Sequence, residues 1–322
     1  MHFSIPTHRL WAAGALAGIC AIAACSSASA AAYAAAAHAA AKASSPVATR
    51  VTVTRNAVAA PPQPAPRAVV TRVRTADGSL VTVAVFRGPV RYVLHDGSQD
   101  PGPAAAGLVR AGSAVTGAER RQLLAAFNGG FKLAAGAGGY MQEGHVISPL
   151  RPGFASLVID RSGRARIGVW GDGTPSPGEA VYSVRQNLQP LVLDGKPTAA
   201  AYDWGLWGAT LGGGAYVARS ALGQDAAGDL IYAASMSAVP ADLAQVLARS
   251  GARIAMELDI NPAWVQLAAA ARPGGRLRAE VYGQYRPADQ YLVGWSRDFI
   301  TVLAPSTSSP AATPVDLQRL RP

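Results

Sequence analysis

One segment restricts the fold of this chain more than any other: Arg253–Ile260 is an apolar run that carries two acidic residues two positions apart. Side chains alternate between the faces of a strand, so Glu257 and Asp259 share one face. Two neighbouring buried carboxylates are costly unless they have partners, because like charges repel and desolvation opposes ionisation. The segment therefore predicts a strand whose acids either form an acid/base pair or are bridged to arginines.

The N-terminus, residues 1–25, has the pattern of a bacterial export signal. A basic residue precedes the apolar stretch Leu10–Ala24, and small residues follow it. The stretch is shorter than the roughly 20 residues that a membrane-spanning helix needs. Ile22-Ala23-Ala24-Cys25 resembles a lipobox, the site at which bacterial lipoproteins are cut and the cysteine is diacylated. We expect an exported protein, either a cell-membrane lipoprotein anchored through Cys25 or a protein secreted freely after cleavage at Ala28-Ser29-Ala30.

Cysteine content and charge narrow the classes of partner. Both cysteines, Cys20 and Cys25, lie in the export segment, so no internal disulfide is expected in the folded part. The formal net charge is +10, carried mostly by arginine, and it would attract anionic envelope polymers or phosphate-bearing substrates. The arginines are scattered and no nucleic-acid motif is present, so nucleic acid is not a predicted partner. Membrane contact is expected only through the lipid anchor.

Composition also divides the chain. Residues 26–67 are rich in Ala, Ser and Pro and lack the large apolar side chains that offset chain entropy, so they predict a disordered tether. Residues 305–322 predict a flexible tail. Between them, residues 68–304 contain more strand patterns than helix patterns. We expect one domain of α+β class there, with a largely antiparallel β-sheet and a few packed helices.

The fold prediction rests on two hairpins and several short apolar runs. Alternating residues around turn signals predict hairpins over Val69–Val85 and Ala155–Val169. Helices are expected at Arg120–Phe127, after a capping box that begins at Thr116, and at Pro240–Ser250. Further strands are expected at Arg91–Leu94, Val184–Val192, Tyr216–Ala221, Leu230–Ala234 and Val293–Leu303.

Polar residues within or after apolar segments are candidate substrate contacts. Asn128-Gly129-Gly130 combines an amide suited to a sugar hydroxyl with glycines that allow close approach of the backbone; a helix C-cap is the alternative. Arg219 stands in an apolar strand, where it would bind phosphate or form an ion pair with one of the two acids. Asn187 is a similar polar group in another strand. Three tryptophans offer either a flat face for a sugar ring or core packing: Trp204, Trp207 and Trp264.

Other chemistries lack their motifs. There is no Gly-x-Ser-x-Gly elbow of the common hydrolases, and the glycine run Leu211–Gly214 lacks the lysine of a phosphate loop. The five histidines show no paired spacing typical of a zinc or iron site, so His145 is expected in a loop. No cofactor is predicted, and a divalent metal is left open.

Three segments taken together resemble the phosphodiester glycosidase family, whose namesake removes N-acetylglucosamine from mannose 6-phosphate diesters. They are Asn128-Gly129-Gly130-Phe131, Arg219-Ser220-Ala221-Leu222-Gly223 and Glu257-Leu258-Asp259. The family has an Asn-Gly-Gly-Phe loop, an Arg-Thr/Ser-Ala-hydrophobic-Gly strand and a strand that ends in Leu-Asp-Gly-Gly-Gly-Ser, in the same order. After Asp259, this chain reads Ile260-Asn261-Pro262-Ala263 instead. Proline fixes φ and removes a backbone donor, so a turn that offers N–H groups to phosphate cannot form in the same way.

The resemblance implies an exported glycoside hydrolase that cleaves sugar-1-phosphodiester or related bonds in envelope or extracellular glycopolymers. Asp259 and Glu257 are then the expected acid/base pair, with Cα atoms about 6.5–7 Å apart along a strand, a spacing that leaves retention and inversion both open. The residues expected to contact a carbohydrate or sugar-phosphate substrate are Asn128, Gly129, Gly130, Asn187, Trp207, Arg219, Ser220 and Asn261. Arg219 would neutralise phosphate charge.

The altered turn after Asp259 motivates an alternative from a different class. Losing part of the site is one way in which an enzyme becomes a lectin, so the chain could be a non-catalytic lipoprotein that binds envelope polysaccharide in the same groove. A structural accessory to polysaccharide export is a third possibility. Glycan binding without turnover would separate the second reading from the first.

Overall fold

The computed structural model describes residues 65–102, 107, 111–208 and 213–305. The chain divides into two units, residues 1–60 and 61–322, and the described residues all belong to the second. The predicted export signal, the lipidation site Cys25, most of the tether and the tail after residue 305 lie outside the described residues. None of the described helices has the length and apolar character needed to cross a bilayer.

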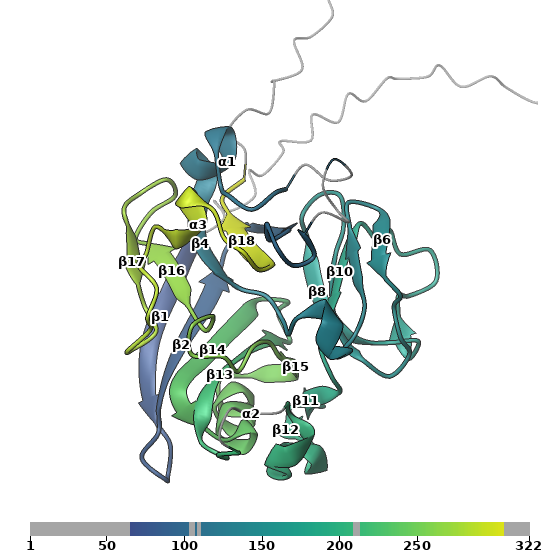
Figure 1. Cartoon of the computed structure of the whole chain (residues 1–322), viewed down its shortest axis with the longest axis vertical. Coiled ribbons are helices and arrows are strands. Elements are labelled where there is room, and N and C mark those ends of the chain that lie inside the picture. Colours follow the sequence, from purple (N-terminus) through teal and green to yellow (C-terminus); the bar gives the residue numbers. More distant parts are fainter. Residues whose placement is uncertain (1–64, 103–106, 108–110, 209–212, 306–322) are drawn as a thin grey trace, which may run out of the picture. The chain divides into compact units, whose positions relative to one another are not determined.

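Three β-sheets make up the described part (Figure 1). The largest has seven strands in the order β1-β2-β14-β13-β15-β11-β12, and all its neighbours are antiparallel. Its strands are β1 (Arg67–Arg74), β2 (Leu80–Arg87), β11 (Pro190–Leu193), β12 (Lys196–Pro197), β13 (Val217–Asp225), β14 (Leu230–Ala238) and β15 (Ala252–Glu257). The β1–β2 pair is the hairpin predicted from its alternating residues.

The second sheet has six strands in the order β6-β5-β10-β7-β8-β9, of which only the β8–β9 neighbours are parallel. Its strands are β5 (Tyr140–Gln142), β6 (His145–Ser148), β7 (Ala155–Ile159), β8 (Ala165–Trp170), β9 (Gly173–Thr174) and β10 (Ser183–Gln186). The β7–β8 pair confirms the second predicted hairpin.

The third sheet has five antiparallel strands in the order β17-β16-β4-β18-β3. They are β3 (Arg91–His95), β4 (Leu123–Asn128), β16 (Leu267–Ala270), β17 (Leu277–Ala279) and β18 (Phe299–Leu303). The predicted strand Val293–Leu303 is strand only in its second half, because its first residue ends the short helix α3 (Gln290–Val293).

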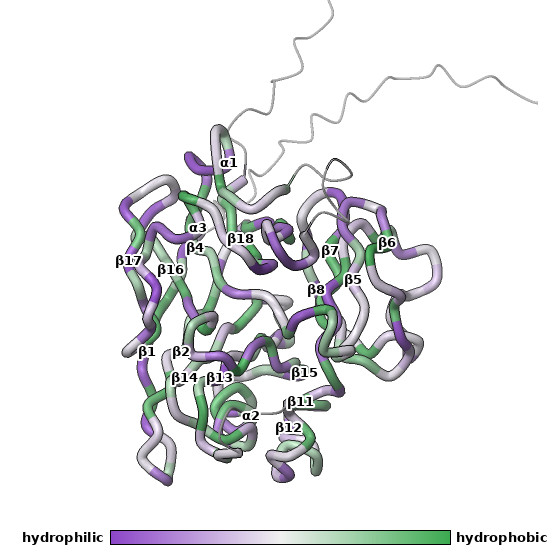
Figure 2. Tube along the Cα trace, in the orientation of Figure 1, coloured by the Kyte–Doolittle hydropathy of each residue, from purple (hydrophilic) through white to green (hydrophobic). Residues whose placement is uncertain are grey.

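Two apolar clusters lie on opposite faces of the seven-stranded sheet. Helix α2 (Pro240–Arg249), predicted with nearly these bounds, buries Leu243 and Leu247 against Val83 and Ile231 on one face. On the other face, a second cluster joins all three sheets and includes the stacked rings of Phe86 and Phe127. Figure 2 shows apolar stretches along the central strands and α2, with polar stretches mainly in the connections.

The predicted helix Arg120–Phe127 is wrong for its second half. Helix α1 (Gly117–Gln122) ends early, and β4 follows it with all six residues buried. A short continuous apolar run fits a strand buried on both faces as well as a helix. The expected capping box does not form, because the Glu119 carboxylate pairs with the His95 ring at 2.7 Å and accepts a hydrogen bond from Thr301.

The predicted strand Val184–Val192 is two strands in different sheets. β10 ends at Gln186 and β11 begins at Pro190, and Leu188 between them has φ +54°. The chain therefore turns here from the six-stranded to the seven-stranded sheet. With this correction, a mostly antiparallel β architecture with few helices is confirmed, whereas the single-domain boundary at 68–304 stays a prediction.

Candidate active site

The site lies where β4 and β15 end close to β13. Asn128 ends β4, Ser220 lies in β13, and Asp259 follows the last residue of β15 by two positions. The Ser220 N–H donates to the Asp259 carbonyl at 2.9 Å, and the Asp259 N–H donates to the Ser220 hydroxyl at 3.1 Å. The Asn128 amide donates to that same hydroxyl at 2.9 Å. These contacts hold the backbone of Asp259 in one place.

A cavity of about 440 Å³ opens beside Asp259. Its wall is built from the loop after β4 and from the segment after β15. The lining residues are Phe131, Lys132, Ala135, Ala137, Leu188, Gly208, Asp259, Ile260, Asn261 and Trp264. Among these described lining residues, Asp259 is the one acid and Lys132 the one base, so a single carboxylate faces a cavity with a cation on its wall.

Arg297, just before β18, lies behind this cavity. Its Nη2 is 3.8 Å from the Asp259 carboxylate and 3.2 Å from that of Asp100, and it donates to the Gly130 carbonyl at 3.0 Å. Its guanidinium carbon lies 4.4 Å from the ring centroid of Trp264. The side chain is buried, yet Nε and Nη1 make no hydrogen bond to a described residue. Buried donors without partners are costly, and these two belong to a residue that contacts Asp259 and Trp264 of the cavity wall.

Burial raises the pKa of Asp259 to about 7. The negative charge of Asp298 adds to the rise. The Asn261 N–H, which donates to the Asp259 carboxylate at 2.8 Å, and the charge of Arg297 act in the opposite direction. A carboxyl that titrates near neutral pH in a cavity has the property required of a general base or acid.

Glu257 lies apart from the cavity lining. Its side chain is fully buried, and it forms an ion pair of 2.7 Å with Arg219. Burial opposes ionisation of Glu257 and raises its pKa, whereas the charge and the hydrogen bond of Arg219 act in the opposite direction. Arg219 also donates to the carbonyls of Ala238 at 3.1 Å and Trp207 at 3.2 Å. Glu257 and Arg219 thus form an arginine-bridged pair, which the sequence left open as the alternative to an acid/base pair. Neither residue lines the cavity.

Several predicted contact residues have structural partners instead. The Asn128 carbonyl oxygen accepts from the Tyr232 hydroxyl at 2.8 Å, so both ends of its amide are used within the protein. Asn187 donates to the carbonyl of Leu258 at 2.9 Å and accepts from the Phe131 N–H at 3.1 Å. Trp207 is fully buried in the apolar cluster around α2. Besides Asp259, the candidate contacts that line the cavity are Asn261 and Trp264.

The two glycines after Asn128 allow close packing against a buried ion pair. Arg185 and Asp298 form this pair at 2.7 Å, and each is almost completely buried. A β-carbon at Gly129 would collide with the Asp298 carboxylate, and one at Gly130 would lie 2.9 Å from the Arg185 guanidinium. The Gly130 N–H also donates to Asp298 at 3.3 Å. The glycines therefore fit against the protein itself.

Sequence analysis missed Arg297, Asp298 and the role of Lys132. Arg297 and Asp298 stand immediately before the buried strand β18, as Glu257 and Asp259 stand at the end of β15. Charged residues beside an apolar strand need partners at both places. Among the described residues, no group of three or more His, Cys, Asp or Glu side chains is placed to hold a metal ion.

Comparisons with known proteins found similar solved structures and one matching family model. A similar solved structure is the catalytic domain of zebrafish N-acetylglucosamine-1-phosphodiester alpha-N-acetylglucosaminidase, auto-inhibited by its pro-peptide, with 13% identity over 77% of this chain and 85% of that one, and a TM-score of 0.46. A hypothetical protein from Synechocystis is 15% identical over 77% of this chain and 64% of that one, with a TM-score of 0.45. No curated protein gave a significant match. The family model for phosphodiester glycosidases matches residues 121–259, which include β4, Arg219 and the acid strand.

Proposed function

We propose that the chain is a hydrolase that cleaves the bond between the anomeric carbon and phosphate in a sugar 1-phosphodiester. The observation that carries this proposal is the position of Asp259 on the cavity wall, 3.8 Å from a buried arginine with two unpartnered donor nitrogens. The match of residues 121–259 to the phosphodiester glycosidase family supports the reaction class.

Two cations close to the Trp264 ring suit a phosphodiester. Lys132 Nζ lies 5.1 Å from the Trp264 ring centroid, and the Arg297 guanidinium carbon lies 4.4 Å from it. A phosphodiester carries one negative charge, and the phosphate monoester that leaves carries more. Arg297 and Lys132 therefore interact more strongly with the leaving group than with the substrate, which is the condition for lowering the barrier.

Asp259 acts as the general base in this proposal. Its carboxylate takes a proton from a water molecule whose oxygen bonds to the anomeric carbon. The bond from that carbon to the phosphate oxygen breaks, and its electron pair stays on the phosphate monoester. A phosphate is stable as an anion, so the arginine can replace the second carboxylic acid that protonates an alkoxide leaving group in other glycosidases. One carboxylate on the cavity is then sufficient.

The direct test replaces Asp259 with Asn, which removes the base and keeps the side-chain volume. The measurement is release of reducing sugar from a panel of sugar 1-phosphate methyl esters, with Asp172→Asn as a control at an exposed acid. We expect the Asp259 variant to lose at least about 100-fold in kcat, the size of a typical general-base contribution, while the control keeps its rate. Full activity in the Asp259 variant would remove this residue from the mechanism. Binding of the panel by the unsubstituted protein without turnover would favour a polysaccharide-binding lipoprotein.

The cellular site of the reaction is part of the same proposal. The N-terminal export pattern and the net charge of +10 support action on anionic glycopolymers of the envelope or the extracellular space. The substrate at that location would be a polymer whose sugars are joined through phosphate groups.

A further inference from the structure

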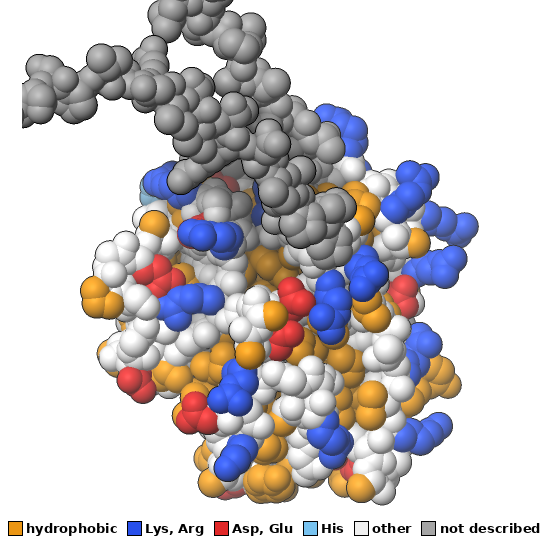
Figure 3. All heavy atoms as spheres, turned by 180° about the vertical axis from the view of Figure 1, so that it is seen from behind, with side chains coloured by type: hydrophobic (Ala, Val, Ile, Leu, Met, Phe, Trp, Pro, Cys, Tyr) orange, Lys and Arg blue, Asp and Glu red, His pale blue; other side chains and the backbone are white. Residues whose placement is uncertain are grey.

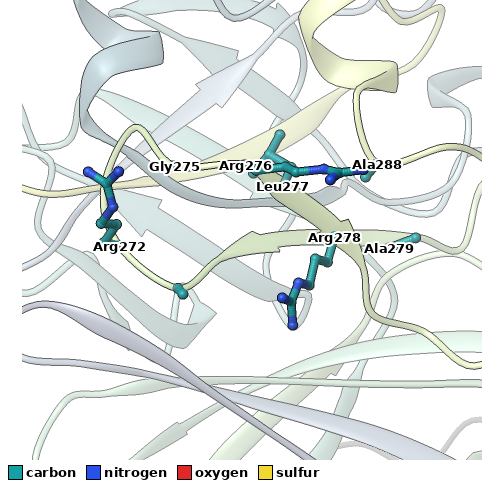
Figure 4. A pocket seen from close by; sticks show the side chains of 8 residues that line it. Arg272, Gly275, Arg276, Leu277, Arg278, Ala279 and Ala288 are labelled. Atoms are coloured by element: carbon teal, nitrogen blue, oxygen red, sulfur yellow. The ribbon is translucent and has the colours of Figure 1, made fainter.

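Three arginines line a second hollow of about 740 Å³ at the β16–β17 hairpin. Arg272 and Arg276 lie in the connection between the two strands, and Arg278 lies in β17. All three are exposed, and Figure 4 shows their side chains spread along the hairpin: Arg272 and Arg276 leave opposite sides of the turn, and Arg278 extends away from both. Their charges thus do not converge on one point.

These three guanidinium groups have no partners in the part of the chain that the structure describes. None of them makes a hydrogen bond or an ion pair with a described residue. Other arginines do pair with acids, and these are Arg87, Arg164, Arg166, Arg185, Arg219 and Arg297. The face in Figure 3 likewise carries more basic than acidic side chains. Unneutralised positive charge along a groove attracts an anionic ligand.

The hairpin holds its arginines on an anchored turn. The Gly274 N–H donates to the Leu123 carbonyl at 2.9 Å, and Arg120 donates to the Gly275 carbonyl at 3.2 Å. Gly274 has φ +69°, and a β-carbon there would lie 2.6 Å from the Arg121 carbonyl oxygen. Because the backbone of the turn is already ordered by these contacts, binding through its arginines costs less conformational entropy than binding through a free loop.

The hairpin is joined to the candidate active site by β16. Trp264 on the cavity wall precedes β16, whose Leu267 pairs with Phe127 and whose Ala269 pairs with Ala125. The arginine turn follows the other end of this four-residue strand, roughly 13 Å further along at about 3.3 Å per residue. A ligand that reached both places would have to be a chain of several units.

We propose that the hairpin arginines form a secondary binding site for a linear polymer with regularly spaced phosphodiesters, the same polymer class whose bond is cut beside Asp259. This inference rests on the proposed function. Guanidinium groups bind phosphate oxygens through paired hydrogen bonds, and three separate guanidinium groups can each bind a different phosphate of one chain. The lining includes no aromatic side chain on which a base could stack, which favours a sugar-phosphate or polyol-phosphate chain over single-stranded nucleic acid.

The test compares two triple variants of equal charge change in the mature chain. One is Arg272→Gln/Arg276→Gln/Arg278→Gln. The control is Arg67→Gln/Arg249→Gln/Arg253→Gln, which removes three exposed arginines elsewhere. Each is also made in the Asp259→Asn background, so that the ligand is not cut. The ligand is fluorescently labelled long-chain poly(glycerol phosphate), measured by anisotropy over a series of salt concentrations, with glycerol 3-phosphate and duplex DNA as competitors.

We expect the hairpin variant to lose at least about 10-fold in affinity for the polymer, and the slope of log K against log salt to fall by about 2, at roughly 0.7 for each lost phosphate contact. The control variant should bind like the unsubstituted protein, and glycerol 3-phosphate should not compete. Equal losses in both variants, or stronger competition by DNA than by unlabelled polymer, would overturn the proposal.

Turnover separates this inference from the proposed function. In the Asp259-containing background, the hairpin variant should hydrolyse short sugar 1-phosphate methyl esters at the unchanged rate. Arginine-dependent polymer binding by a protein that hydrolyses no ester would refute the proposed reaction and leave the secondary site standing. Hydrolysis of the esters together with polymer binding that does not depend on these arginines would refute the secondary site and leave the proposed reaction standing.

Discussion

Arg297 Nη2 lies 3.8 Å from the carboxylate of Asp259, and the remaining two nitrogens of this guanidinium have no partner among the described residues. The pair combines a carboxyl whose pKa is raised to about 7 with a cation that has unused hydrogen-bond donors. This relationship distinguishes the cavity beside Trp264 from the second hollow, which carries arginines but no acid among its described lining residues.

Replacing Arg297 with Gln should lower kcat/KM for sugar 1-phosphate esters by about 100-fold or more, because a preorganised charge on the leaving group is lost. Since the arginine also lowers the pKa of Asp259, the pH dependence of the residual activity should shift to higher pH. Steady-state kinetics over a pH series check both effects. Arg67→Gln is the exposed control, and an unshifted profile with wild-type rate in the Arg297 variant would contradict the assignment.

The pH dependence of the unsubstituted protein follows from the raised pKa of Asp259. A general base must be ionised, so kcat/KM should fall about tenfold per pH unit below about 7 and level off above it. Initial rates between pH 5 and 9 measure this limb. A profile that is flat across pH 6 to 8 would exclude Asp259 as the base.

The raised pKa of Asp259 affects stability in the opposite direction: activity increases with pH, whereas the free energy of unfolding decreases. The folded chain keeps a proton on Asp259 between its ordinary pKa, near 4, and about 7, whereas the unfolded chain has released it. The folded state binds more protons in this window, so this group makes the free energy of unfolding decrease as pH rises through it. Asp259→Asn should remove that decrease, which thermal unfolding at pH 5 and pH 8 would detect as a smaller difference between the two midpoints.

Glu257→Gln should destabilise the protein by about 3–5 kcal/mol, because it leaves the buried Arg219 charge without its partner. The catalytic rate of the folded fraction should stay within a few-fold of wild type, since Glu257 does not line the cavity. Denaturant unfolding and kinetics on the same samples give both quantities. The double variant Glu257→Gln/Arg219→Met should recover most of the lost stability, and a large loss of kcat with intact stability would restore Glu257 to the reaction.

Cys25→Ala should abolish membrane attachment if the lipobox-like segment is processed as predicted. In cells labelled with a palmitate analogue, the unsubstituted protein should carry label and fractionate with membranes, whereas the variant should do neither. Cys20→Ala is the matched control at the other cysteine. An unlabelled mature protein that begins near Ala31 would show free secretion instead.

The local sequence was sufficient to predict the elements in which apolar and polar side chains recur with a clear period. The β1–β2 and β7–β8 hairpins and helix α2 each carry this period together with turn or stop residues, and each forms where it was expected. β4 carries no period, because both of its faces are buried, and its sequence fits helix and strand equally well. Its pairing with β16 and β18, which come more than 130 residues later in the sequence, determines that it is a strand.

The motif Asn128-Gly129-Gly130, the arginine in β13 and the acid strand are all visible in the amino-acid order, and all three lie in the region that matches the phosphodiester glycosidase model. The different roles of Glu257 and Asp259 could not be read from the sequence. Strand alternation makes Glu257 and Asp259 equivalent, but β15 ends at Glu257, and only Asp259 reaches the cavity. Glu257 is committed to Arg219 from β13, and Asp259 is close to Arg297 from the segment before β18. Burial and long-range ion pairs set these roles, and both depend on how distant strands are brought together.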